Sequence, residues 1–166
     1  MWKRMSAAGA GLVLAVGGWV AAGHWTQGRI AACEQRSAVL STLEVLNRQP
    51  DSVRPDSPAF GCDQDRIVAY ASRQFHAATG PTVDRLSDRV AGDVDHAAVT
   101  AFYRQALEGD KWRILARKAT PGPDAASLCA RKELPFGTVY LDVSFPFAGS
   151  YEVTAADTTG AGARCA

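Results

Sequence analysis

Four cysteines are the residues of this chain with the clearest chemical consequence. Cys33, Cys62, Cys129 and Cys165 all follow an uncharged apolar run, and no two have the Cys-x-x-Cys spacing that is common in zinc sites. An even number of cysteines in an exported chain indicates disulfides, and four cysteines allow three pairings. We favour Cys33–Cys62 and Cys129–Cys165, because the first pair would fasten a helix that follows the apolar run and the second would fasten a C-terminal tail that otherwise frays.

The three histidines are too dispersed to predict a catalytic site. His24 lies beside the apolar run, His76 follows a short apolar stretch, and His96 lies near Asp93 and Asp95. A carboxylate beside His96 could orient it as a general base, but aspartate at such a position more commonly caps a helix and complements its dipole. We therefore predict that His96 is a solvated residue at a helix start, and we assign no catalytic residue.

Metal and nucleotide motifs are equally weak. Asp63-Gln64-Asp65 alternates carboxylates as some calcium loops do, but the third ligand, the central glycine and the closing glutamate of such a loop are missing. The sequence also contains none of the short motifs of serine hydrolases, zinc proteases or P-loop proteins. We expect no metal and no cofactor. An enzyme is the less favoured class, although catalytic triads assemble from distant positions and leave no local motif.

The N-terminal residues predict export. Lys3-Arg4 precedes an apolar run from Ser6 to Gly23 without a charged side chain, which is typical of a helix whose basic end stays in the cytoplasm. The length of the run lies between the roughly 7–15 residues of a cleavable signal and the about 20 of a spanning helix. Trp19 and Trp25 would suit an interfacial belt, so we favour a retained signal-anchor over 6–25. The alternatives are a cleaved signal, which would leave a secreted protein, and a buried core helix.

Lipidation is a competing role for Cys33. Ile30-Ala31-Ala32 supplies the small residues that bacterial lipoprotein processing requires before a cysteine. The apolar core should then adjoin this segment directly, but a charged stretch at His24–Arg29 intervenes. Lipidation would also leave an odd number of cysteines in an exported domain, so the disulfide is favoured.

The charge balance argues against nucleic acid as a partner. Lys3 and Arg4 are two of the 18 basic residues, so the remaining 16 are matched by 17 acidic residues and the exported part carries a net charge of −1. No basic stripe of the kind that contacts phosphate backbones is present. We expect the partners to be the membrane, through 6–25, and another membrane or envelope protein.

Hydrophobic periodicity predicts an α+β domain. Apolar residues recur at helical spacing from Ile30 to Arg48, and a proline-rich linker follows up to residue 61. A second helix is expected over Val94–Glu108. Strands are expected at Arg66–His76, Lys111–Arg117, Ser127–Glu133, Val139–Phe145 and Tyr151–Ala156, and the period-two pattern of several of them indicates one buried and one largely solvated face.

The buried face of the second helix is also predicted. Five of its residues share one side at 3.6-residue spacing: Val99, Phe102, Tyr103, Ala106 and Leu107. Together with Trp112, these aromatic residues are more commonly core than the lining of a ligand groove. A weak apolar patch at Val83, Leu86 and Val90 would be a further short helix.

The sequence thus predicts four parts: a cytoplasmic basic tip (1–5), a transmembrane signal-anchor (6–25), an amphipathic helix with a proline-rich linker (26–61) and an extracytoplasmic domain (62–166). In the domain, a helix packs on a four- or five-stranded, mainly antiparallel sheet in two layers. We expect a membrane-tethered module that binds or assembles without catalysis. A small cell-envelope hydrolase that uses His76 or His96, and an accessory structural subunit of a membrane complex, are the alternatives.

Overall fold

The computed structural model describes residues 27–51, 53–78, 94–116, 128–147, 149–157 and 165. The expected tip and signal-anchor (1–25), His24, Asp93 and the apolar patch at Val83–Val90 lie outside them. Among the residues described, no helix is both long enough and apolar enough to cross a membrane.

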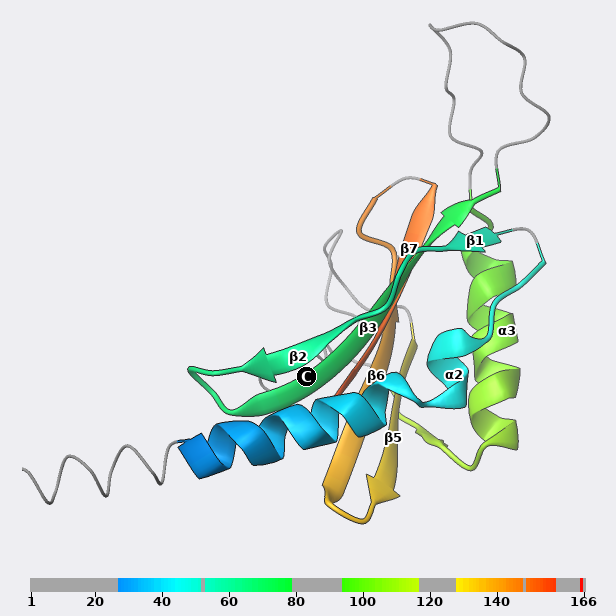
Figure 1. Ribbon diagram of the computed structural model, residues 1–166. Helices are drawn as coiled ribbons and strands as arrows, with labels where there is room; N and C mark the ends of the chain where they lie inside the picture. Colours follow the sequence, from blue (N-terminus) through cyan, green and yellow to red (C-terminus); the bar gives the residue numbers. More distant parts are fainter. Residues whose placement is uncertain are drawn as a thin grey trace, which may run out of the picture.

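The fold is α+β, built on an antiparallel sheet of seven strands (Figure 1). The strands are β1 (Val53–Pro55), β2 (Ala59–Asp63), β3 (Val68–Ala77), β4 (Arg113–Ile114), β5 (Leu128–Leu134), β6 (Gly137–Ser144) and β7 (Ser150–Ala156). Their order is β1-β3-β7-β6-β5-β4, and β2 pairs with β3 on the same side as β1. The expectation of four or five strands was therefore too low.

The two additional strands come from the segment that was expected to be an irregular linker. β1 pairs with the C-terminal part of β3, with Pro55 opposite Phe75, and β2 pairs with its N-terminal part, with Cys62 opposite Ala69. Proline lacks a backbone N–H, but an edge strand needs hydrogen bonds on only one side. The prolines therefore divide the edge of the sheet into two short strands, β1 and β2, and do not prevent either from pairing with β3.

The helical layer differs from the expectation at one point. A helix over residues 27–41 ends at a turn in which Thr42 and Leu43 donate backbone hydrogen bonds to Val39 and Leu40, and α2 (Glu44–Asn47) begins after it. The single helix predicted from Ile30 to Arg48 is thus broken. After the break the chain changes direction, and Val45 and Leu46 of α2 are buried in the core.

The helix α3 (His96–Gly109) agrees well with its predicted bounds. The carboxylate of Asp95 caps its start by accepting hydrogen bonds from the backbone N–H groups of Ala97 and Ala98 at 2.9 and 3.0 Å. Four of the five residues of its predicted face are buried, namely Val99, Tyr103, Ala106 and Leu107. Phe102 is only partly buried at the margin of the core.

One face of the sheet packs against the helices and forms the main core. In Figure 1 the helix over 27–41 (blue) runs along β2 and β3, and α3 (light green) lies beside α2. Trp112 belongs to this core, whereas β4 is shorter than predicted and Ala116 is exposed. The opposite face of the central strands is less solvated than their alternation predicts. Asp142, Ser144 and Thr154 are 1, 1 and 8% exposed, and a second small apolar cluster, which includes Cys165, lies on this side.

Two covalent links hold the layers, and they join the pairs that the sequence analysis favoured. Cys33 is bonded to Cys62 and Cys129 to Cys165, with Cα–Cα distances of 5.7 and 5.5 Å. The first bond attaches the N-terminal helix to β2, and the second attaches the C-terminal residues to β5. Such bonds fit a domain that folds in an oxidising compartment outside the cytoplasm.

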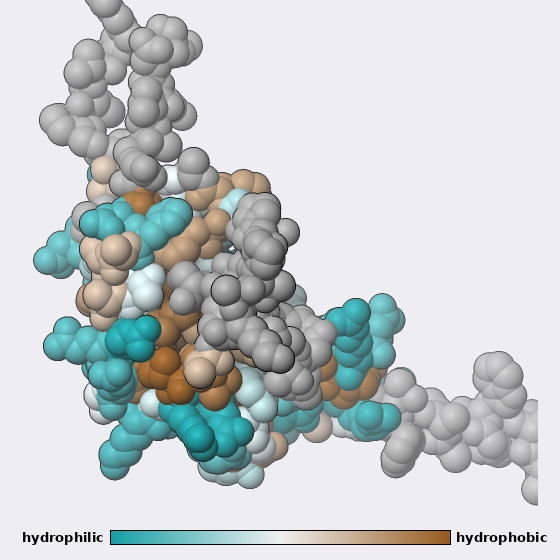
Figure 2. Space-filling view, turned by 180° about the vertical axis from the view of Figure 1, so that it is seen from behind, coloured by the Kyte–Doolittle hydropathy of each residue, from teal (hydrophilic) through white to brown (hydrophobic). Residues whose placement is uncertain are grey.

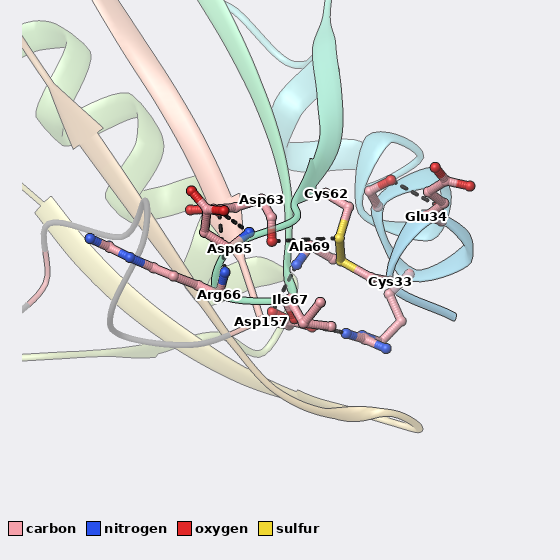
Figure 3. The surroundings of a disulfide bond; sticks show 11 residues. Cys33, Glu34, Cys62, Asp63, Asp65, Arg66, Ile67, Ala69 and Asp157 are labelled. Atoms are coloured by element: carbon pink, nitrogen blue, oxygen red, sulfur yellow. Dashed lines mark hydrogen bonds and ion pairs between the residues drawn. A yellow bond between two sulfur atoms is a disulfide. The ribbon is translucent and has the colours of Figure 1, made fainter. Parts of the chain in front are cut away.

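An ion pair reinforces the attachment of the N-terminal helix (Figure 3). Arg36 Nε donates to Asp157 Oδ2 at 2.6 Å, and Asp157 Oδ1 accepts the backbone N–H of Ala69 at 3.1 Å. The Asp157 side chain is 9% exposed, so its charge is largely removed from water and depends on these partners. The helix is thus fixed to the sheet at Cys33 and again at Arg36.

Candidate binding site on the outer face of the sheet

We call the face of the sheet that points away from the helices the outer face. Strand register places five residues of this face side by side, one from each of β3, β7, β6, β5 and β4: Tyr70, Ala156, Tyr140, Arg131 and Arg113. Adjacent strands lie about 4.8 Å apart, so this outer row extends over about 19 Å. It combines aromatic, small and cationic side chains in one line.

The outer row is accessible mainly at its arginine end, because Cys165 packs against the cluster of Ala156, Tyr70 and Tyr140. Arg113 is exposed, Arg131, Tyr140 and Tyr70 are of intermediate exposure, and Ala156 is fully buried between the two tyrosine strands. Figure 2, which views the molecule from behind, shows apolar side chains with hydrophilic ones around them on the coloured part of that surface. Side chains that are rigid at one end and accessible at the other are typical of ligand contacts.

Gly61 makes room for the tyrosine at the β3 end of the row. It is the register partner of Tyr70 on β2, and a Cβ atom at Gly61 would lie 3.2 Å from the Tyr70 hydroxyl oxygen. That distance is shorter than an ordinary van der Waals contact, so a larger residue at 61 would require the Tyr70 ring to shift by a few tenths of an ångström. Gly61 thus leaves room for Tyr70 in its present position.

The other end of the row holds two like charges. Arg113 and Arg131 are direct register partners on β4 and β5, and like charges in this position destabilise a sheet. The ion pairs found within the described residues join Arg36 to Asp157, Arg48 to Glu44, His76 to Asp56 and Lys132 to Asp110, and they leave both arginines without a carboxylate. The cost of this juxtaposition is therefore not offset by an acidic partner in that part of the chain.

Lys132, which follows Arg131 on β5 and lies on the opposite face, has a carboxylate partner that balances its charge. Lys132 Nζ contacts Asp110 Oδ1 at 2.9 Å and lies 5.7 Å from the centre of the Trp112 ring, and Trp112 Nε1 donates to Asp110 Oδ2 at 3.0 Å. Partial burial alone would raise the pKa of Asp110, but the hydrogen bonds from Lys132 and Trp112, with the positive charges of Lys132 and Arg48, outweigh it and lower that pKa. Arg113 and Arg131 have no comparable arrangement in the described part of the chain.

Among the histidines, His76 acquires a carboxylate partner from a distant segment. His76 Nε2 lies 3.0 Å from Asp56 Oδ2, with both side chains about half exposed at 47 and 53%. The register partner of His76 on β7 is Ser150, whose hydroxyl donates to the Phe147 carbonyl at 3.5 Å and which is 3% exposed. Asp, His and Ser are therefore aligned across the edge of the sheet, but the serine faces a backbone acceptor.

His96 is the first residue of α3 and its ring stacks on Phe145 with a centroid distance of 3.9 Å. His96 is exposed at the start of the helix, and Phe145 covers one face of its ring. A hollow of about 550 Å³ extends from His96 along the exposed side of α3 to Glu108. Its described lining comes from this single helix, so the hollow offers no convergent polar groups and is a weaker candidate than the outer row.

The acidic pair Asp63 and Asp65 lies in a turn. Asp63 Oδ1 accepts the backbone N–H groups of Asp65 and Arg66 at 3.1 and 3.3 Å, and the turn leads through Ile67, which has a positive φ of 55°, into β3. The Asp63 carboxylate therefore stabilises the reversal between β2 and β3. Within the residues described, no group of three metal-ligating side chains is found.

Comparison with known proteins gives no further guide. No family model matches the chain, and neither the curated proteins nor the solved structures contain a significant match. The functional argument consequently depends on the geometry of the molecule itself.

Proposed function

We propose that this chain is a membrane-tethered, extracytoplasmic module that binds or assembles through the outer face of its sheet and makes or breaks no bond. The observation that carries the proposal is the outer row of a disulfide-linked scaffold, in which Tyr70 on β3 is followed, beyond β7, by Tyr140, Arg131 and Arg113 on the adjacent strands β6, β5 and β4. Tyrosine and arginine are the side chains most enriched at binding surfaces, because they combine apolar contact with hydrogen bonding.

The location part of the proposal is supported by two independent features. Lys3-Arg4 and the uncharged run Ser6–Gly23 have the composition of a signal-anchor, and the two disulfides fit an oxidising compartment. The intact chain should remain with membranes after a carbonate wash, and protease added from outside should reach its C-terminal domain. Recovery of a soluble mature protein that starts near Gly23 would contradict the anchor and leave export standing.

Complementation of a deletion strain with full-length variants tests the binding function. Tyr140→Ala removes the central ring of the outer row and should abolish complementation, whereas the control Arg104→Ala, on the exposed side of α3, should complement fully. His76→Ala and His96→Ala, singly and together, should also complement. Replacing Ser6–Gly23 by a cleavable signal should abolish complementation because tethering is lost.

A small hydrolase is the second candidate, and the contact between His76 and Asp56 is the observation in its favour. In that reading Asp56 orients His76, and His76 accepts the proton of the Ser150 hydroxyl as its oxygen attacks an acyl carbon. The hydroxyl would first have to leave the Phe147 carbonyl. A fluorophosphonate probe separates the two functions: labelling that disappears in Ser150→Ala and His76→Ala would establish the hydrolase, and an unlabelled chain together with full complementation by His76→Ala would exclude this site.

A further inference from the structure

We propose that two copies of this chain dimerise by pairing their β2 strands edge to edge, antiparallel to one another, around Gly61. The contact joins the seven-stranded sheet of one copy to that of the other (Figure 1). It uses the backbone of β2 and not the side chains of the outer row. The dimer therefore goes beyond the binding function proposed above and does not depend on it.

The backbone groups of β3 point alternately to its two neighbouring strands. On the side of β7, the Ala69 carbonyl accepts the N–H of Asp157 at 3.1 Å. On the side of β1 and β2, the Gln74 carbonyl accepts the N–H of Asp56 at 2.9 Å. Because this direction alternates along a strand, odd-numbered residues of β3 bond to β7 and even-numbered residues bond to β1 and β2.

This alternation decides which backbone groups of β2 are free of β3. Ala59, Gly61 and Asp63 are the register partners of even-numbered residues of β3, so their backbone groups bond to that strand. The N–H and C=O groups of Phe60 and Cys62 point the other way. Among the described residues, β2 pairs with no strand except β3, so this outward side is an open sheet edge.

Prolines protect the neighbouring part of this edge but not β2 itself. Pro55 on β1 lies opposite Phe75, an odd-numbered residue of β3, so its ring nitrogen, which carries no hydrogen, points outward. Pro58 directly precedes β2. Prolines and charged side chains prevent an edge strand from pairing further, and the stretch 59–62 contains neither. Since Phe60 is also 53% exposed, β2 is an open, uncharged and partly apolar edge that a specific partner strand would cover.

A second copy of β2 fits this edge. Antiparallel pairing about a two-fold axis at Gly61 places Phe60 of each copy opposite Cys62 of the other. Both residues point outward, so each of these pairs exchanges both of its N–H···O bonds. Ala59 lies opposite Asp63, so no like charges meet in the paired strands. The two glycines face one another at the axis, where the strands approach most closely and neither has a side chain to collide.

The side chains favour the same register. Phe60 lies on the same face as Cys62, which is bonded to Cys33 of the N-terminal helix, so each exposed ring would cover the disulfide of the other copy. A shift of two residues in one direction would pair Cys62 with Pro58, which has no N–H to donate. The opposite shift would carry the pairing into the turn at 64–67. The register centred on Gly61 is therefore the one that uses the whole strand.

Amide hydrogen exchange of the full-length chain in a neutral detergent, measured by NMR over a range of protein concentrations, tests the contact. In dilute protein the N–H groups of Gly61 and Asp63, which face β3, should exchange slowly, and those of Phe60 and Cys62 should exchange fast. Raising the concentration should slow Phe60 and Cys62 at least tenfold, in step with the dimer mass found by sedimentation equilibrium. A contact between two five-residue strands is small, so the dimer should dissociate on dilution.

Two variants of one residue and a matched control locate the contact. Phe60→Pro removes an outward N–H without breaking the ladder to β3, and Phe60→Lys adds a charge at the edge. Each should weaken dimerisation at least tenfold and keep the native far-UV spectrum, and Phe60→Lys carries the test if the proline variant fails to fold. Phe147→Lys replaces a 69% exposed phenylalanine between β6 and β7, and it should dimerise as the wild type does.

Several results would overturn the dimer. A chain that stays monomeric at high concentration excludes it, and a dimer in which the Phe60 and Cys62 amides still exchange fast has its contact elsewhere. Equal dimerisation of Phe60→Lys and the wild type excludes it as well. A monomer with both amides protected at every concentration would show that another segment of the same chain covers the edge. A monomer that gains this protection only when a different protein is added would assign the edge to a foreign strand.

Discussion

Replacing Tyr103 with phenylalanine removes one oxygen atom from the centre of the core. Tyr103 is 0% exposed, its hydroxyl donates to the Arg48 carbonyl at 2.7 Å, and the same hydroxyl lies 3.4 Å from that of Tyr151. The ring also packs edge-on against Phe102 and Tyr151. Phenylalanine retains the ring contacts, so Tyr103→Phe isolates the contribution of the hydroxyl.

The expected cost follows from the groups that lose a partner. The Arg48 carbonyl, which follows α2, loses its donor, and the buried hydroxyl of Tyr151 loses its neighbour. Leaving a buried polar group unsatisfied costs about 1–3 kcal/mol. For a domain of this size that corresponds to a fall in melting temperature of roughly 4–12 °C.

Thermal and urea unfolding of the wild type and Tyr103→Phe measure this difference. Tyr140→Phe is the matched control, because it deletes a hydroxyl from a partly exposed tyrosine of the outer row and should change stability by less than about 0.5 kcal/mol. Equal stability of the two variants would refute the view that the Tyr103 hydroxyl links α3 to the segment after α2.

The same pair of tyrosines predicts an alkaline limit of stability. Burial raises the pKa of Tyr103, and it raises the pKa of Tyr151 to about 12 despite the opposing effect of the hydrogen bond with Tyr103. Because the folded state favours the neutral phenols, their contribution to stability is complete below the unfolded pKa of about 10 and is lost as the pH rises toward the folded values. The wild type should lose stability steeply above pH of about 10, and Tyr103→Phe should do so less steeply.

Three further predictions concern the scaffold. Replacing both Cys33 and Cys62 with serine should cost about 3.6 kcal/mol by the chain-entropy relation for a loop closed over a separation of 29 residues, measured by urea unfolding; a smaller loss than about 1 kcal/mol would contradict it. The lowered pKa of Asp110 favours its ionised form in the folded state beside Lys132, so this carboxylate contributes stability above pH of about 4 that is lost as the pH falls further. Asp110→Asn should lack this contribution. Identical acid unfolding profiles of the two proteins would refute this. Asp95→Ala should cost about 1 kcal/mol and Asp95→Asn almost nothing, since asparagine also caps helices.

The elements whose signals are local could be predicted from the sequence. Asp95 and Gly109 mark the start and end of α3, and period-two alternation locates β6 closely. The secondary-structure predictions failed where two local sequence patterns indicate different structures. The apolar spacing of Leu40, Leu43 and Leu46 continues across the turn that ends the first helix, so the break was not predicted. The strands β1 and β2 were missed because prolines usually indicate irregular structure, whereas a sheet edge tolerates them.

The candidate site depends on register, which sequence patterns do not supply. Alternation places Arg113 on the face opposite Trp112, but its partner Arg131 is 18 positions away, and no local signal specifies which residues of β4 and β5 align. The contact between His76 and Asp56 has the same origin, since it requires the pairing of β1 with β3. The sequence showed only that Arg113 lies on a short predicted strand and that another predicted strand, with Arg131, follows it. It did not show that the two arginines are opposite one another.

The outer row is located where the scaffold restrains it most. Tyr140 and Ala156 belong to β6 and β7, which have paired strands on both sides, and Arg131 lies two residues from Cys129, whose disulfide fastens β5. Side chains held on central strands lose little conformational freedom on binding, so more of their contact energy contributes to affinity. Arg113 differs because β4 has only two residues and lies at the edge of the sheet. Tyr140 and Arg131 are therefore held more firmly than Arg113, so a variant at Tyr140 tests the proposed binding surface more directly than one at Arg113.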